Sequence, residues 1–200
     1  MPLAPATAFE ARAFVEAWRP RRPVWYRFRW RYDDPEQAYG GRGSARIAPP
    51  DSMRFDFAGP LGMGSGAAVV IGLEPMWARP DRDFRALVPA VPLLWAAFGV
   101  VADPEPGAQA YRGDGGWRFV TGSDTLEYRV TEGPPRVLEV AWRRSGEVVG
   151  RGTTEFAAGG WPRIARLEFP DHRARFQVTM TASDTNAVFA ASQWDPPPAR

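Results

Sequence analysis

The segment VWYRFRWRY, residues 24–32, decides the fold class because apolar and basic residues alternate along it. Strict period-two alternation is typical of a strand that buries one face and exposes the other to water. Arginines occupy most of the positions that would face outwards. The segment therefore predicts a long, half-buried strand with an aromatic inner face. That inner face would carry Val24, Tyr26, Phe28, Trp30 and Tyr32.

Similar alternation recurs along most of the remaining chain, and turns rich in glycine and proline separate the alternating segments. The chain contains 20 Gly and 21 Pro among its 200 residues, a pattern that favours short strands joined by hairpins. An antiparallel sheet of about eleven strands is too long to stay flat, so it should curl towards a barrel. Further strands are expected near 42–48, 53–57, 66–71, 75–78, 108–112, 116–121, 124–130, 136–143, 147–155, 163–169 and 173–182.

Two segments favour helices instead of strands. Residues 7–18 place Phe9, Phe14 and Trp18 at helical spacing, and Thr7 with Glu10 predicts a capping box at the start. Residues 81–99 form the second helical region, whose apolar end should stop at a glycine. We therefore expect an α+β fold with an N-terminal helix and a mid-chain helical lid over a single curled antiparallel sheet. The whole chain, 1–200, is expected to form one domain, with an extension and tail over 184–200.

The composition excludes several kinds of chemistry. The chain has no cysteine and no lysine, so it offers no thiolate, disulfide or Schiff base. His172 is the one histidine and is expected in a solvated turn. A metal site from Asp33, Asp34 and Glu36 is conceivable, but a polar loop is the better interpretation. We find no catalytic motif, so the sequence predicts neither an enzyme nor a cofactor.

The charge pattern argues against nucleic acid as a partner. All 25 basic residues are arginine, the net charge is +2, and the arginines mostly alternate with acidic or apolar residues. A nucleic-acid-binding domain would concentrate them in one basic run. The chain also has no apolar run long enough for a transmembrane helix and no recognisable signal peptide. A cytosolic protein and a mature exported domain both remain open.

Aromatic residues are plentiful, and their role has two interpretations. Five tryptophans are expected on inward-facing positions of strands or helices: Trp30, Trp77, Trp95, Trp117 and Trp142. They would either fill a solid core or line a cavity large enough for a lipid. Composition does not decide between these two.

An ordered set of motifs resembles LolB, the bacterial outer-membrane lipoprotein receptor. GPLG at residues 59–62 follows a strand and precedes a small apolar strand. Pro92, Leu93 or Leu94, Trp95 and Gly99 then match a P-L-x-x-W-x-x-G segment, and GGWRF at 115–119 resembles the strand that comes next. The resemblance spans about residues 24–182, although the specific motifs cover only a small part of that range. The family carries a lipidated N-terminal cysteine that this chain lacks.

The resemblance implies an unclosed half-barrel of about eleven strands with helices as a lid, a fold shared with the periplasmic carrier LolA. It further implies binding of lipoprotein acyl chains and their delivery at the periplasmic side of the outer membrane. Partners would be acylated lipoproteins or lipid, the inner leaflet of that membrane, and a LolA-like carrier. Alternatives are a carrier or sensor of another apolar ligand, such as a glycolipid or isoprenoid, or a filled-core protein-interaction domain.

Two groups of residues are the candidates for function. The loop residues Pro60, Leu61 and Met63 are expected to contact the membrane, because Leu61 matches the leucine that the family projects; alternatively, Leu61 caps the end of the barrel. The other group should line the cavity, since its members alternate on strand faces or lie on the lid. It comprises Tyr26, Phe28, Trp30, Phe55, Phe57, Trp95, Phe98 and Trp117.

Overall fold

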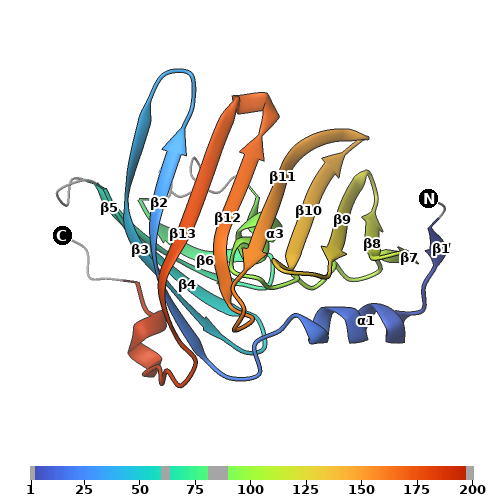
Figure 1. Ribbon diagram of the computed structural model, residues 1–200, viewed down its shortest axis with the longest axis horizontal. Coiled ribbons are helices and arrows are strands. Elements are labelled where there is room, and N and C mark those ends of the chain that lie inside the picture. The colour runs from blue at the N-terminus through green and yellow to red at the C-terminus, as the bar shows by residue number, and fades with distance from the viewer. Residues whose placement is uncertain (1–2, 60–63, 81–89, 197–200) are drawn as a thin grey trace.

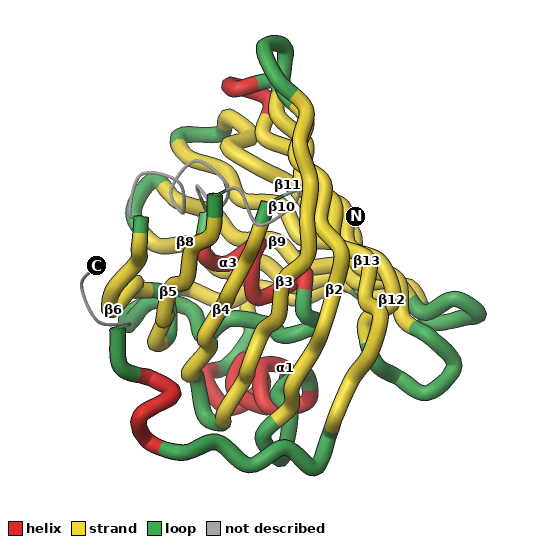
Figure 2. The backbone as a smooth tube through the Cα atoms, turned by 90° about the vertical axis from the view of Figure 1, so that its left-hand side faces the viewer, coloured by secondary structure: helices red, strands yellow, loops and turns green. Residues whose placement is uncertain are grey.

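The computed structural model describes residues 3–59, 64–80 and 90–196, which form one strongly curled antiparallel sheet with two α-helices. The sheet has thirteen strands in the order β1-β7-β8-β9-β10-β11-β12-β13-β2-β3-β4-β5-β6. No backbone pairing joins the end strands β1 and β6 within these residues, so the half-barrel is open (Figures 1 and 2). The predicted α+β half-barrel is confirmed. The strands are β1 Ala4–Pro5, β2 Val24–Asp33, β3 Ala38–Ala48, β4 Ser52–Ala58, β5 Ser65–Ile71, β6 Glu74–Arg79, β7 Gln109–Gly113, β8 Gly116–Thr121, β9 Asp124–Thr131, β10 Val137–Arg144, β11 Glu147–Phe156, β12 Pro162–Phe169 and β13 Ala174–Asp184.

The sheet has one strand more than the twelve predicted ranges, and one of its strands is longer than predicted; both differences occur where the sequence shows no alternation. β1 has only two residues, which pair with β7 at the edge of the sheet, and two residues cannot show alternation. β3 begins at Ala38, four residues earlier than expected, because its first half is rich in glycine and has no side-chain pattern. The long strand β2 matches the prediction closely and alternates buried with exposed residues.

The N-terminal helix α1, Ala8–Ala17, begins with the predicted capping box. The Thr7 amide donates to Glu10 Oε2 at 2.9 Å, and the Glu10 amide donates to Thr7 Oγ1 at 3.3 Å. Phe9, which the helical spacing grouped with Phe14 and Trp18, does not share their buried face, because its side chain is 82% exposed. The helix instead docks through Ala11, Phe14, Val15 and Trp18, which lie on the opposite side of its circumference.

The second helix, α3, Val91–Ala97, lies inside the curl against β10, β11 and β12 (Figure 2). Its residues 93–97 are all buried, as expected for a helix that is apolar all round. Gly99 directly follows the C-cap residue Phe98, and its φ of +74° permits the reversal that ends the helix, so the predicted stop is confirmed. Residues 81–89 of the expected helical region lie outside the described residues.

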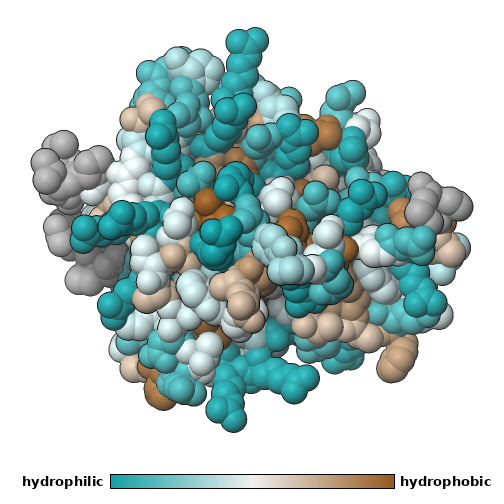
Figure 3. Space-filling model, in the orientation of Figure 1, coloured by the Kyte–Doolittle hydropathy of each residue, from teal (hydrophilic) through white to brown (hydrophobic). Residues whose placement is uncertain are grey.

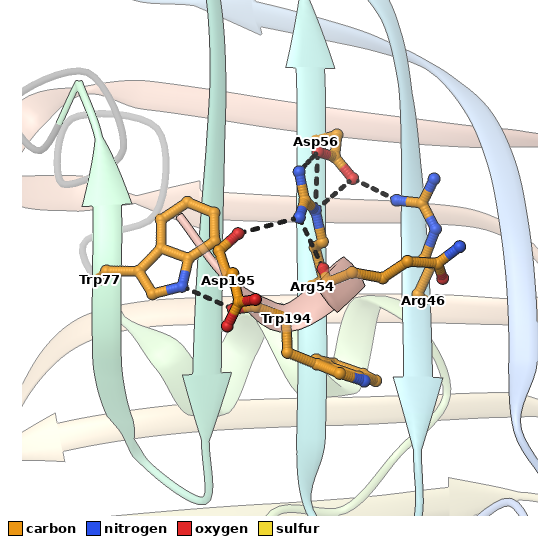
Figure 4. Close-up of polar contacts among 7 residues, drawn as sticks. Arg46, Arg54, Asp56, Trp77, Trp194 and Asp195 are labelled. Atoms are coloured by element: carbon orange, nitrogen blue, oxygen red, sulfur yellow. Dashed lines mark hydrogen bonds and ion pairs between the residues drawn. The ribbon is translucent and has the colours of Figure 1, made fainter. Parts of the chain in front are cut away.

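The C-terminal segment lies on the outer face of the sheet, against β4, β5 and β6 (Figure 4). A short 3-10 helix, η3 Ala191–Trp194, is fixed there by side chains of the strands. Arg54 Nη1 donates to the Gln193 carbonyl at 2.5 Å, and Trp77 Nε1 donates to the Trp194 carbonyl at 2.9 Å. Trp77 therefore faces outwards, contrary to the expectation that it faces the core. Outside the C-terminal segment, the surface of the protein seen in Figure 3 is mostly hydrophilic.

Candidate ligand-binding site

The inner face of β2 and β4 carries five large rings that we call the aromatic wall. All five are buried, with at most 7% of each side chain exposed. Phe28 and Phe55 are nearly parallel at 5.4 Å between ring centroids, although β3 lies between their strands. The wall consists of Tyr26, Phe28, Trp30, Phe55 and Phe57.

Small residues on the flanking strands make room for these rings. Three inward positions of β3 are the small residues Gly41, Gly43 and Ala45, each of which pairs in register with a wall residue of β2. Gly43 and Ala45 also pair with the wall residues of β4 on the other side. A Cβ atom at Gly43 would lie 2.4 Å from Phe28 Cε2, and one at Gly66 of β5 would lie 2.3 Å from Phe57 Cζ. Alternation of large and small residues across neighbouring strands thus builds the wall. The glycines were visible in the sequence, but their partners were not.

Phe98, directly after α3, inserts its ring against the wall. Its centroid lies 5.5 Å from that of Phe28, 5.9 Å from that of Tyr26 and 6.1 Å from that of Phe55. Trp95 of α3 is turned towards the β5–β6 turn, where its Nε1 donates to the Gly72 carbonyl at 2.7 Å. The helix therefore rests on β10–β12, and the side chains of Trp95 and Phe98 reach the opposite half of the sheet.

Trp30 of the wall contacts two further aromatic residues that are not part of it. Trp30 makes edge-on contacts with Phe57 and Tyr39, at 6.1 Å and 5.7 Å, and lies 6.2 Å from Phe176 of β13. Its Nε1 donates to the Arg42 carbonyl at 3.2 Å. Tyr39 and Phe176 were absent from the predicted lining. Tyr39 lies in the part of β3 that showed no alternation, and Phe176 could have been found from the period of β13.

Trp117 does not join the other seven predicted residues. It lies on β8 beneath α1, where its ring stacks on Phe14 at 4.8 Å with an interplanar angle of 11°. Phe119 and Tyr128 complete this separate cluster. The sequence could not distinguish the two groups, because both belong to strands with the same alternation and differ only in which helix covers them.

The rings of the wall touch one another, so this part of the interior is occupied by side chains. Three hollows of about 580, 780 and 800 Å³ occur in the described part of the protein, and residues of the outer face or of the α1 border form most of their linings. No charged side chain belongs to the wall. Burial raises the pKa of Tyr26 to about 12, as expected for a phenol that has lost most of its contact with water.

The candidate membrane loop falls outside the described residues at Pro60, Leu61 and Met63. The structure does define its base. The Gly59 amide donates to the Gly64 carbonyl at 2.7 Å, and Gly64 has a φ of +68° that favours glycine. This hydrogen bond joins the ends of β4 and β5 at the last described residue on either side.

The residues considered for chemistry show no catalytic arrangement in the ranges that we describe. His172 is exposed at the end of a 3-10 turn, Pro170–His172. Asp34 Oδ1 accepts hydrogen bonds from the amides of Glu36 and Gln37 at 2.8 and 2.9 Å. This carboxylate therefore stabilises the polar loop expected from the sequence. No group of three potential metal ligands occurs among the described residues. None of the described helices has the length and apolar character needed to cross a membrane.

Comparison with known proteins identifies the fold. No protein-family model matches the sequence, and no curated protein matches it. A LolA superfamily protein from Nitrosomonas europaea has a similar structure, with a TM-score of 0.54, 9% sequence identity, and coverage of 96% of this chain and 98% of that one. A DUF1329 family protein from Desulfovibrio piger aligns over 94% of this chain and 95% of its own, at 8% identity and a TM-score of 0.47. At such identities the likeness to the first protein concerns the fold alone.

Proposed function

We propose that this protein binds an acyl chain between the aromatic wall and α3. The observation that supports this most directly is the division of the interior between two halves of an open sheet. The wall belongs to β2 and β4, whereas α3 rests on β10–β12. Because no pairing closes the sheet between β1 and β6 in the described residues, a small movement of α3 away from the wall breaks no strand pairing.

The free energies favour replacement of Phe98 at the wall by an acyl chain. Withdrawing Phe98 disrupts three ring contacts, at a cost of about 2–4 kcal/mol, and adds up to about 3 kcal/mol if the ring becomes exposed to water. An acyl chain of a dozen methylenes that enters from water gains about 10 kcal/mol by burial. The same chain gains almost nothing when it enters from a bilayer, which is equally apolar. The site would therefore retain a lipid in water and release it readily at a membrane, as a carrier or receptor requires.

The resemblance of the GPLG and P-L-x-x-W-x-x-G motifs to LolB supports a more specific role. In this role the chain would act as one domain that accepts the acyl chains of a lipoprotein from a LolA-like carrier. It would then deliver them to the inner leaflet of the outer membrane, with Leu61 as the contact with lipid. Transfer of a triacylated lipoprotein from such a carrier to liposomes, with and without this protein, measures the role directly.

A second candidate function is favoured by the ring contacts themselves. Phe28, Phe55 and Phe98 already pack together, which suits a filled-core domain that binds another protein on its surface. The two functions differ in their response to an apolar probe. Only the lipid-binding protein should take up a fluorescent fatty-acid analogue saturably and carry lipid through purification.

The test compares two equivalent substitutions of buried phenylalanines. Phe98→Leu creates space beside the wall, and Phe119→Leu creates similar space in the separate cluster beneath α1. We expect Phe98→Leu to tighten binding of the fatty-acid analogue severalfold, because one contact that the ligand displaces becomes weaker, and Phe119→Leu to leave it unchanged. Native mass spectrometry identifies any copurified lipid and separates acyl chains from glycolipid or isoprenoid. Absence of saturable binding, or an equal response of the two variants, would contradict the proposal.

A further inference from the structure

Two pairs of arginines face each other across strands on the outer face of the sheet, and they differ in their surroundings. Arg46 of β3 lies opposite Arg54 of β4. Asp56 lies between them, 2.5 Å from Arg46 Nη1 and 2.9 Å from Arg54 Nη2 (Figure 4). Like charges placed directly opposite each other destabilise a sheet, and here a carboxylate offsets the repulsion.

The second pair has no such counterion among the residues that the structure describes. Arg29 of β2 lies directly opposite Arg42 of β3, and both side chains are exposed. The next residues in register are Thr179 beside Arg29 and Ala58 beside Arg42, neither of which carries charge. Among the residues that the structure describes, neither guanidinium makes a hydrogen bond or an ion pair with a protein group. The repulsion between these two cations is therefore uncompensated within that part of the chain.

This pair lies in a hollow of about 580 Å³ whose lining provides further donors. Arg27 adds a third guanidinium, which is held over the Trp25 ring at 4.3 Å from its centroid. Ser44 and Thr181 add hydroxyl groups. Asp56 also borders the hollow, but both of its oxygens already accept from Arg46 and Arg54. The hollow thus presents three arginines and a carboxylate that is already neutralised.

We propose that this hollow binds a phosphate group, carried either by a small molecule or by a lipid headgroup. Phosphate offers several acceptor oxygens and a negative charge, and arginine binds it through paired N–H donors. Arg29 and Arg42 would hold it from both sides, with Arg27, Ser44 and Thr181 as the remaining donors. The donors of this site lie on the opposite face of the sheet from the proposed acyl site, because Arg27 and Arg29 point outwards while Phe28 and Trp30 point into the core from the same strand. Phe28 and Phe57 of the wall also border the hollow, beside Gly43.

The first measurement is thermal melting in sodium phosphate compared with sodium chloride at equal ionic strength and pH. A ligand that binds only the folded protein raises its melting temperature. We expect phosphate to raise the melting temperature of the wild type by several degrees more than that of the double variant R29Q/R42Q, which should keep only the general stabilisation that phosphate gives a folded protein. In chloride, the double variant should melt no lower than the wild type, because the substitution removes a repulsion.

The control is the double variant R151Q/R175Q, which removes the same charge from the same face. Both of these arginines approach Glu168, at 2.6 and 3.9 Å, and both are well exposed. This variant should keep the full response to phosphate. The proposal is overturned if the wild type gains nothing specific from phosphate, or if the two double variants lose the response equally, which would indicate only general electrostatic attraction.

Sedimentation with vesicles then identifies the source of the phosphate. Vesicles of phosphatidylglycerol mixed with phosphatidylcholine should bind the wild type and R151Q/R175Q but not R29Q/R42Q if the headgroup is the ligand. A phosphate-dependent rise in melting temperature without vesicle binding indicates that the ligand is a soluble phosphate compound. This outcome supports the proposed site as well. The proposed phosphate site is rejected if all three proteins bind vesicles equally and phosphate causes no specific rise in melting temperature.

Discussion

Thr154 in β11 donates a hydrogen bond of 2.7 Å from its hydroxyl group to the carbonyl oxygen of Ala96 in α3. Apart from tyrosines and tryptophans, it is the one buried side chain with a polar group among the described residues, and only 1% of it is exposed. The bond therefore fixes the position of the helix on the strand beneath it. Because α3 carries Phe98 towards the aromatic wall, this contact also determines where that ring enters the interior.

Replacement of Thr154 by valine should lower the free energy of unfolding by about 1 kcal/mol, because the isosteric side chain loses one hydrogen bond. The Ala96 carbonyl keeps its bond from the Gly99 amide, so the loss should stay moderate. Urea denaturation measures the change. Thr153→Val, on the opposite face of the same strand, is the control and should shift stability by less than about 0.5 kcal/mol. Equal effects of the two substitutions would mean that the buried bond has no special role.

Replacement of Leu61 by glutamate tests the proposed membrane contact. If the leucine projects into solvent between the paired residues Gly59 and Gly64, the substitution should leave the melting temperature and fatty-acid binding unchanged. Association with liposomes should weaken, because the apolar insertion of a leucine, which contributes about 1.5–3 kcal/mol, is lost. Melting and liposome sedimentation of the same variant check this. A large fall in melting temperature without a membrane defect would place Leu61 in the core.

Tyr26 should make the protein sensitive to alkaline pH. Its pKa rises to about 12 in the folded state because of burial, whereas an unfolded tyrosine ionises near pH 10. The folded state thus favours the protonated phenol, and this contribution is complete below pH 10 and lost between about pH 10 and 12. Two pKa units correspond to about 2–3 kcal/mol.

Denaturation series at pH 8 and pH 11 of the wild type and Tyr26→Phe measure this contribution. The variant should lose less stability over that interval than the wild type does. Tyr32, whose pKa burial also raises to about 12, keeps part of the dependence in both proteins. Tyr111→Phe at the sheet edge is the control. An unchanged pH dependence in Tyr26→Phe would show that its burial does not perturb its ionisation.

Arg54 should hold the C-terminal segment on the outer face of the sheet. Its guanidinium donates to the Gln193 carbonyl at 2.5 Å and also contacts both oxygens of Asp56. We expect Arg54→Gln to cost about 1–3 kcal/mol and to accelerate amide exchange across residues 190–196. Arg46→Gln, which contacts Asp56 but not the C-terminal segment, should leave that exchange unchanged. Equal protection of the segment in both variants would contradict this role.

The sequence by itself determined the strands, because a period of two is a local property that one buried face imposes on each strand. Residues 24–32 alternate in the structure as predicted, and most later strands begin and end within a few residues of expectation. The capping box of Thr7 and Glu10 and the stop at Gly99 were local as well. The family resemblance that rests on the motifs around residues 59–62 and 92–99 implied an open half-barrel as well.

Only the tertiary structure decided which aromatic residues meet. Trp117 and Phe55 lie on strands with the same alternation, yet one stacks beneath α1 and the other in the wall. Trp77 faces the C-terminal segment instead of the core, because the tail covers the outer face of β6 and supplies a carbonyl to the indole. The pairing of Arg29 with Arg42 likewise depends on the register between β2 and β3. Periodicity assigns each residue to a face of its strand, but which residue lies opposite depends on strand order and register, which are set by packing between segments far apart in the chain.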